Sequence, residues 1–169
     1  AHTSKRLKHK LMNRFRKFGG ARATLVYGYV LPEDGDTYYQ MQKDPTATPV
    51  LVDGLELLRQ TLNCTAVAQR FNSNGVPVGP GCRRKTWDGA MVRRLFANPL
   101  QKGSPQRGKM MTIKHHETGR RISVANPDGP ISIDCPHLAH LDAAELDEVN
   151  ALLDDWNANR GRKASNGVD

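Results

Sequence analysis

Apolar residues recur at helical spacing in five stretches of the chain, and these stretches predict its helices. In the first, Leu7, Leu11 and Phe15 stand at i, i+4 and i+8 and form one apolar stripe on an otherwise basic segment. Gly19 and Gly20 then end the helix. The predicted helices cover residues 3–18, 50–62, 65–73, 87–97 and 143–157.

Shorter runs rich in β-branched and aromatic residues, separated by turn residues, predict small β-hairpins. The predicted strands cover residues 24–31, 37–42, 109–115, 120–125 and 131–133, and residues 100–108 read as a polar link. The fold class is therefore α+β, a helix-rich domain with a helix-turn-helix-like core and small β-hairpins.

The two middle helices, 65–73 and 87–97, are the segment around which the rest is organised. Asn74-Gly75 and the Pro/Gly-rich run 76–81 separate them, and Thr65 and Thr86 are the expected N-caps. At about 100° per residue the second helix turns an apolar face to the core, made of Trp87, Met91, Val92, Leu95 and Phe96. Its other face carries Thr86, Gly89, Ala90, Arg93 and Ala97, with Arg94 at the edge. Small residues beside arginines allow a helix to approach a DNA groove closely.

The charge is distributed unevenly along the chain. The net charge is +8, with eight Lys/Arg and no acidic residue in 1–22, and eleven Lys/Arg against two acidic residues in 83–121. The remaining residues sum to −9, and the helix 143–157 is acidic on its outer face. Two basic blocks on an acidic body predict an oriented surface for a polyanion, and double-stranded DNA is the simplest such partner. The acidic helix should lie away from DNA.

Three parts of the middle block, 67–77, 85–87 and 91–99, resemble the "recombinase" DNA-binding domain of large serine recombinases, the phage integrases and transposon resolvases. Tyr27-Gly28-Tyr29 and His140-Leu141-Asp142 fit the same family pattern in the same order. The resemblance implies a domain at 23–160, a basic helix at 1–22 that joins it to a catalytic domain outside this chain, and a polar tail at 161–169 leading to a further module.

The resemblance also implies a role: recognition of part of an attachment site in DNA integration and recombination. Family members keep the nucleophilic serine and its arginines in the separate catalytic domain, so this chain alone should not cut or join DNA. We expect Thr86 and Arg93 to contact bases and Arg94 to reach from bases to phosphate. The expected phosphate contacts are Arg83, Arg84, Lys85, Lys102, Arg107, Lys109 and Lys114.

Two alternatives remain open from the sequence. One is a stand-alone helix-turn-helix transcription regulator. The other is a metal-dependent nuclease that uses Cys135, His137 and His140, helped by His115 and His116, although their spacing fits no zinc motif. The preferred interpretation needs no metal and no cofactor.

No apolar run approaches the roughly 20 residues that span a bilayer, and no secretory signal pattern is present. The three cysteines are odd in number and suggest reduced thiols. We expect a cytoplasmic protein of bacterial or phage origin, monomeric as this fragment, whose full-length parent forms a dimer or tetramer on DNA.

Overall fold

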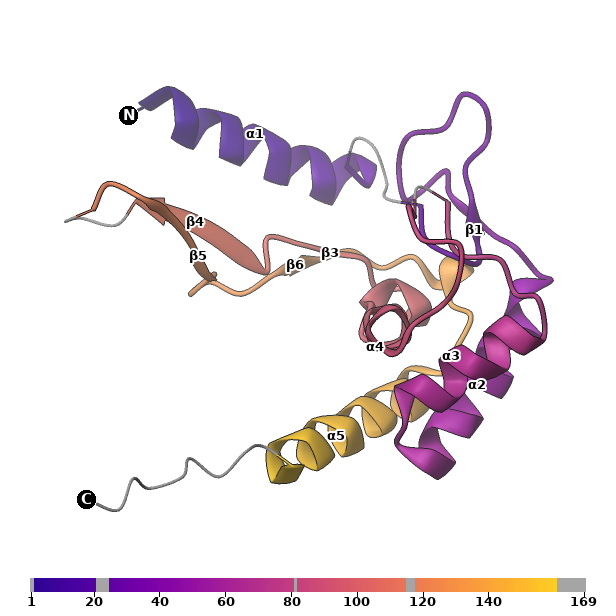
Figure 1. Ribbon diagram of the computed structural model, residues 1–169. Helices are drawn as coiled ribbons and strands as arrows, with labels where there is room; N and C mark the ends of the chain where they lie inside the picture. Colours follow the sequence, from indigo (N-terminus) through magenta and orange to yellow (C-terminus); the bar gives the residue numbers. More distant parts are fainter. Residues whose placement is uncertain (1, 21–24, 81, 115–117, 161–169) are drawn as a thin grey trace, which may run out of the picture.

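The computed structural model describes residues 2–20, 25–80, 82–114 and 118–160 (Figure 1). Within these ranges the chain forms five α-helices, two short 3₁₀ helices and three two-stranded antiparallel sheets, which confirms a helix-rich α+β fold. The helices are α1 (His2–Phe18), α2 (Ala47–Thr61), α3 (Cys64–Ser73), α4 (Gly89–Phe96), α5 (Ala143–Arg160), η1 (Pro99–Lys102) and η2 (Pro136–Leu138). The sheets pair β1 (Tyr29–Val30) with β2 (Gln42–Lys43), β3 (Gln106–Arg107) with β6 (Ile131–Ser132), and β4 (Met110–Lys114) with β5 (Arg121–Ala125).

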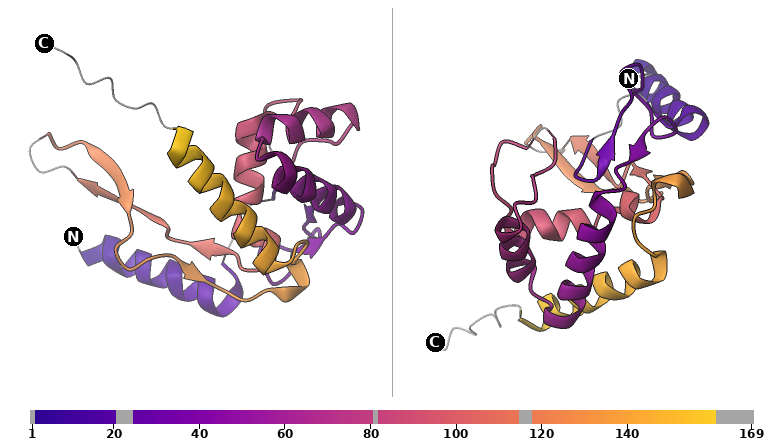
Figure 2. Two further views of the ribbon diagram at one scale, coloured as in Figure 1. Left: turned by 90° about the horizontal axis from the view of Figure 1, so that it is seen from below. Right: turned by 90° about the vertical axis from the view of Figure 1, so that its right-hand side faces the viewer.

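Three elements project from the helical body in the same general direction. Figure 1 shows α1, the β4–β5 hairpin and α5 extending toward the left of the view, with α2 and α3 at the right. In the left view of Figure 2, α4 has α5 on one side and the α2–α3 pair on the other. The acidic helix α5 is therefore a neighbour of the predicted recognition helix.

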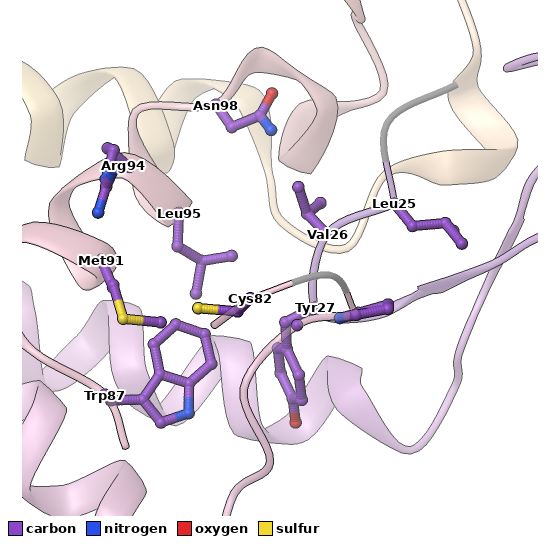
Figure 3. Close-up of a pocket in the computed structure, with 11 residues that line it drawn as sticks. Leu25, Val26, Tyr27, Cys82, Trp87, Met91, Arg94, Leu95 and Asn98 are labelled. Carbon is purple, nitrogen blue, oxygen red and sulfur yellow. The ribbon is translucent and has the colours of Figure 1, made fainter. Parts of the chain in front are cut away.

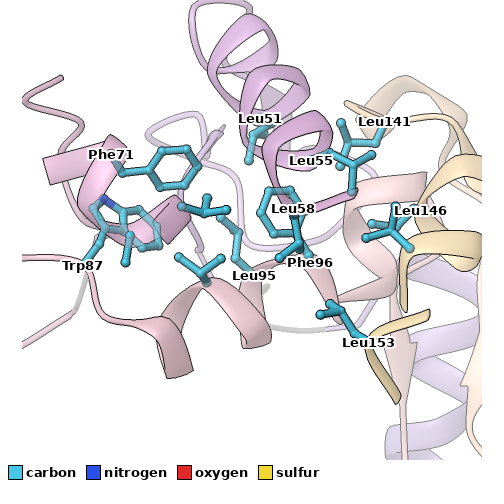
Figure 4. Packing of buried hydrophobic residues seen from close by; sticks show 14 of the residues in the cluster. Leu51, Leu55, Leu58, Phe71, Trp87, Leu95, Phe96, Leu141, Leu146 and Leu153 are labelled. Atoms are coloured by element: carbon cyan, nitrogen blue, oxygen red, sulfur yellow. The ribbon is translucent and has the colours of Figure 1, made fainter. Parts of the chain in front are cut away.

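The main hydrophobic core joins α2, α3, α4 and α5 (Figure 4). Each of these helices contributes residues from the apolar stripe that its sequence periodicity predicts, such as Leu51, Leu55 and Leu58 of α2, which are all buried. The largest members from the other helices are Phe71, Leu95, Phe96, Leu146 and Leu153. Burial of these side chains fixes α4 and α5 to one common body.

A second, smaller core anchors the end of α1. Phe15 is 1% exposed and packs with Tyr29, Met41 and residues of η1, η2 and the segment between β6 and η2. Gly19 and Gly20, both with positive φ, then turn the chain away, as the sequence predicts. Leu7, Leu11 and Phe18 stay exposed, so the stripe predicted along this helix is buried only at Phe15.

Two predicted strands are wrong in extent. The runs 24–31 and 37–42 form strands only at Tyr29–Val30 and Gln42–Lys43, and Thr24 lies outside the described residues. The side-chain oxygen of Gln40 accepts hydrogen bonds from the backbone amides of Asp36 and Thr37 and from the Thr37 hydroxyl. These bonds stabilise a turn where the pattern predicted a strand. The predicted polar link 100–108 likewise contains η1 and β3.

The N-caps of α3 and α4 also differ from the prediction. The side chain of Asn63, rather than Thr65, accepts from the amides of Thr65 and Ala66, and α3 begins at Cys64. Asp88, rather than Thr86, accepts from the amide of Met91, and α4 begins at Gly89. Both true caps have extended backbone, as a cap requires.

Gly54 has a packing role that the sequence did not show. From helix propensity alone, alanine at this position in α2 would be better by about 1 kcal/mol. In the structure a Cβ on Gly54 would lie 2.6 Å from Cζ of Phe71 and 3.2 Å from Cζ of Phe96. The missing side chain is what allows α3 and α4 to pack closely against α2.

Gly54→Ala should therefore destabilise the protein by about 1–3 kcal/mol, because the new methyl group overpacks the core. Urea unfolding gives the difference. The same substitution combined with Phe71→Leu should cost less than the sum of the two single changes, because a smaller side chain at 71 makes room. A stabilised Gly54→Ala variant would show that propensity outweighs packing here.

His140 lies between the two cores and is 6% exposed. Its Nε2 donates to the carbonyl oxygen of Gly28 at 2.7 Å, because a carbonyl only accepts, and its Nδ1 then accepts from the Thr48 hydroxyl at 2.8 Å. The ring also packs edge-on against Tyr29, with centroids 4.8 Å apart. Burial lowers the pKa of His140 below its usual 6.5, and this outweighs the Gly28 carbonyl, which raises it. The folded protein therefore holds His140 neutral.

Stability should fall as pH drops below about 6.5, because the unfolded chain then binds a proton that folded His140 does not. The contribution is fully present above that pH and is lost progressively below it. Urea midpoints at pH 7.5 and pH 5.5 test this. His140→Gln should lower stability at both values but flatten the pH dependence, whereas His137→Gln, at an exposed position, serves as the control. An unchanged slope in His140→Gln would assign the acid sensitivity to other groups.

Candidate nucleic-acid interface

The α3–α4 pair is positioned by contacts of Trp87. Asn72 of α3 accepts from the amide of Trp87 at 2.8 Å and donates to its carbonyl at 3.0 Å, and Trp87 Nε1 donates to the carbonyl of Val76 at 3.0 Å. The indole packs edge-on between Tyr27 and Phe71. The connection from Asn74 to Asp88 is much longer than the three- or four-residue turn of a helix-turn-helix unit. The hydrogen bonds of Trp87 nevertheless fix the end of this connection against α3.

The outer face of α4 consists of Ala90, Arg94 and Ala97, which are exposed at i, i+4 and i+7. Arg94 Nε donates to the Ala90 carbonyl at 3.2 Å, so the guanidinium lies along this face. Gly89 was expected on the same face but is half-buried, and a Cβ there would lie 2.9 Å from the hydroxyl oxygen of Thr65. Two small residues and one arginine thus form the open surface of the helix.

An open hollow of about 340 Å³ lies beside this face (Figure 3). Met91, Arg94 and Leu95 of α4 line one side, and Val26 and Tyr27 line the other. Met91 was expected in the core, but it is only half-buried and faces this hollow. A ligand on α4 would therefore find apolar surface next to the Arg94 guanidinium.

Arg93, the main predicted base contact, is turned toward α5. Its Nη1 donates to Oδ1 of Asn150 at 2.5 Å, and its Nη2 donates to Oδ1 of Asp154 at 2.5 Å. The side chain is only 28% exposed. The sequence placed Arg93 on the outer face, but the structure places it at the edge of that face, where α5 covers it.

Two more predicted phosphate contacts also have acidic partners within the chain. Lys102 Nζ lies 2.7 Å from both carboxylate oxygens of Asp147 of α5, and its side chain is 24% exposed. Arg84 forms an ion pair with Asp88, the N-cap residue of α4. The acidic helix α5 therefore contacts Arg93 and Lys102, and the prediction that it lies away from DNA stays a prediction.

The other predicted contacts form two groups in the structure. Arg83, Lys85 and Thr86 are exposed on the segment that leads into α4, and no ion pair joins them to another described residue. Arg107 is half-buried in β3, and Lys109 and Lys114 are exposed at and in the β4–β5 hairpin. Figure 1 shows this hairpin as a projection, so its lysines form a second basic group apart from the α4 segment.

The hairpin is amphipathic. Paired residues share a face, so Met111, Ile113, Ile122 and Val124 form an apolar side, and Thr112, Lys114, Arg121 and Ser123 form a polar, cationic side. Lys114 and Arg121 stand directly opposite each other, an arrangement that costs stability unless an anion lies nearby. Arg121 belongs to the basic edge that the sequence predicts for this hairpin, together with Lys109, Lys114 and Arg120, and the pairing register makes it a further candidate phosphate contact beside Lys114.

Among the described residues, Cys135, His137 and His140 do not form a metal site. His140 uses both ring nitrogens in hydrogen bonds, Cys135 is buried, and His137 is exposed. Burial, with a smaller effect of Asp134, raises the pKa of Cys135 and keeps the thiol protonated. Across the part of the chain that the structure describes, no cluster of three His, Cys, Asp or Glu side chains could hold an ion. His115 and His116 lie outside that part.

The structure also bears on membrane association: no helix among the described residues is both long and apolar enough to cross a bilayer. In comparisons with known proteins, no protein-family model matches the chain, and no curated protein matches it.

Proposed function

We propose that this chain binds double-stranded DNA through the outer face of α4 and the basic segment that leads into it. The observation that carries the proposal is the combination of an exposed Ala90–Arg94–Ala97 face with Arg83 and Lys85, which have no acidic partner among the described residues. A helix with small residues on both sides of an arginine fits the major groove closely enough for base contacts.

The hairpin supplies the second part of the proposed surface. Lys109, Lys114 and Arg121 would bind phosphates, and so would Arg107 at the base of the hairpin. Phosphate contacts of this kind set the affinity and register of binding rather than the choice of DNA sequence. Arg84, Arg93 and Lys102 would take part only by exchanging their carboxylate partners for phosphate or base atoms.

We further propose that this DNA-binding module belongs to a site-specific serine recombinase of bacterial or phage origin, where it recognises part of an attachment site. The support is the sequence pattern in the middle block together with its flanking segments. In the structure those segments meet, since His140 binds the carbonyl of Gly28 within the Tyr27-Gly28-Tyr29 run. A Cβ at Gly28, whose φ is +91°, would lie 3.0 Å from His140 Nε2, so the glycine is required for this contact.

Selection of bound duplexes from a random library tests both parts of the proposal. If the chain binds DNA sequence-specifically, we expect the selection to recover a preferred sequence that binds at least about 10³-fold more tightly than a scrambled duplex. Recovered sequences that map to the ends of integrated elements would support the recombinase assignment, whereas sequences upstream of genes would favour the stand-alone regulator. Failure to bind any duplex at low salt would contradict the proposal itself.

Substitutions should separate base contacts from phosphate contacts. Arg94→Ala should weaken binding to the selected duplex by about 1–3 kcal/mol and relax one base position, because Arg94 is the cation on the open face of α4. Arg83→Ala with Lys85→Ala should weaken binding to all duplexes and reduce the salt slope by about 2. Fluorescence anisotropy across a salt series measures both.

Arg59→Ala is the control for these variants. It removes one positive charge from α2, where Arg59 forms an exposed ion pair with Glu148. An equal loss in Arg94→Ala and Arg59→Ala would show that binding depends on net charge and not on the α4 face.

A further inference from the structure

We propose that Asp154 and Asp147 of α5 act as built-in counter-ions. They hold Arg93 and Lys102 in ion pairs until phosphates or bases of a cognate duplex replace the two carboxylates. The inference rests on the proposed function and concerns regulation of the same surface. Its central observation is that the acidic helix forms ion pairs with two of the cations that follow the basic segment, one on α4 and one on η1.

The pairing is specific in its geometry. The Arg93 guanidinium is shared between a carboxylate, Asp154, and an amide, Asn150, each at 2.5 Å. Asn150 is itself oriented, because its side-chain nitrogen donates to the carbonyls of Phe96 and Leu146 at 2.8 and 2.9 Å. Arg93 therefore has a defined position in the free protein, and Asp154 is the negatively charged one of its two partners.

The ion pairs are open to exchange, whereas the helix that carries the carboxylates is not. Leu146, Val149 and Leu153 are at most 2% exposed and fix α5 in the main core. By contrast, the carboxylate side chains of Asp147 and Asp154 are 60% and 72% exposed. Because the carboxylates are the exposed members of these pairs, they can turn toward solvent while α5 stays in place, and this leaves Arg93 and Lys102 to an incoming phosphate.

The built-in anions change what a duplex gains from Arg93 and Lys102. When a free surface cation binds a DNA phosphate, a cation condensed on the DNA is released into bulk solution, and this release favours binding to any DNA sequence. When Arg93 or Lys102 exchanges its carboxylate for a phosphate, the carboxylate left behind on α5 attracts a cation in turn, so the net release is small and the two residues add little to non-specific binding. Arg93 and Lys102 add to the affinity only when the duplex places phosphate or base atoms where they can replace the carboxylate.

The test compares two neighbouring aspartates. Asp154→Asn removes the partner of Arg93, and Asp155→Asn makes the same change in charge at the next residue, which is exposed and forms no ion pair with a described residue. Asp154→Asn should tighten binding to a scrambled duplex about two- to fivefold more than Asp155→Asn does. In an Arg93→Ala background this difference should disappear, because there is no cation left to free.

The outcomes are distinguishable by anisotropy, with circular dichroism to verify that each variant is folded. Equal tightening in Asp154→Asn and Asp155→Asn would overturn the inference and leave the DNA-binding proposal intact. Weaker binding in Asp154→Asn would also overturn it and would assign Asp154 the role of orienting Arg93 for DNA. Absence of salt-sensitive binding by the unmodified protein would overturn the proposed function and this inference with it.

Discussion

The reciprocal hydrogen bonds between Asn72 and the backbone of Trp87 are the constraint on which the arrangement of α3 and α4 depends. The connection between the two helices contains several prolines and glycines and would not by itself place α4. The Asn72 amide uses its donor and its acceptor on one residue, and the indole packs between Tyr27 and Phe71. The start of α4 is thereby fixed against α3, and the cations before it lie on the exposed segment 82–86.

The same interaction explains why the sequence predicted the helices better than their ends. Spacing of apolar residues located the five helices, because burial of one apolar stripe stabilises α2, α3, α4 and α5, while α1 is anchored through Phe15 alone. The cap was misplaced because Thr86 and Asp88 are both residue types that cap helices. The carbonyl of Trp87 accepts from Asn72 instead of from Met91, so residue 87 is not part of the helix, and Asp88 becomes the cap. A local rule could not choose between them without this tertiary contact.

The sequence predicted which residues make up the candidate site, but not which of them form ion pairs within the protein. Periodicity gives the direction of a side chain relative to its own helix and says nothing about which neighbour it meets. The partners of Arg93 lie 57 and 61 residues away, and that of Lys102 lies 45 residues away. Gly54 shows the same limit in the core, since its effect on stability depends on contacts with Phe71 and Phe96 of other helices. Arg94 was assigned to the edge of the face, and the structure makes it the centre because Arg93 is covered.

Internal pairing also affects how such a surface discriminates between DNA sequences. Cations that have no acidic partner within the described part of the chain, such as Arg83 and Lys85, would attract any duplex, and salt would screen this attraction. Arg93 and Lys102 already have carboxylate partners at hydrogen-bonding distance, so an exchange brings a net gain only where the new contacts are at least as well oriented. On the proposed surface, correct and incorrect DNA sequences would then differ more in affinity than on a surface of free cations. The acidic α5 would thus reduce binding overall while increasing the difference between sites, which is the property that a site-specific DNA-binding protein needs.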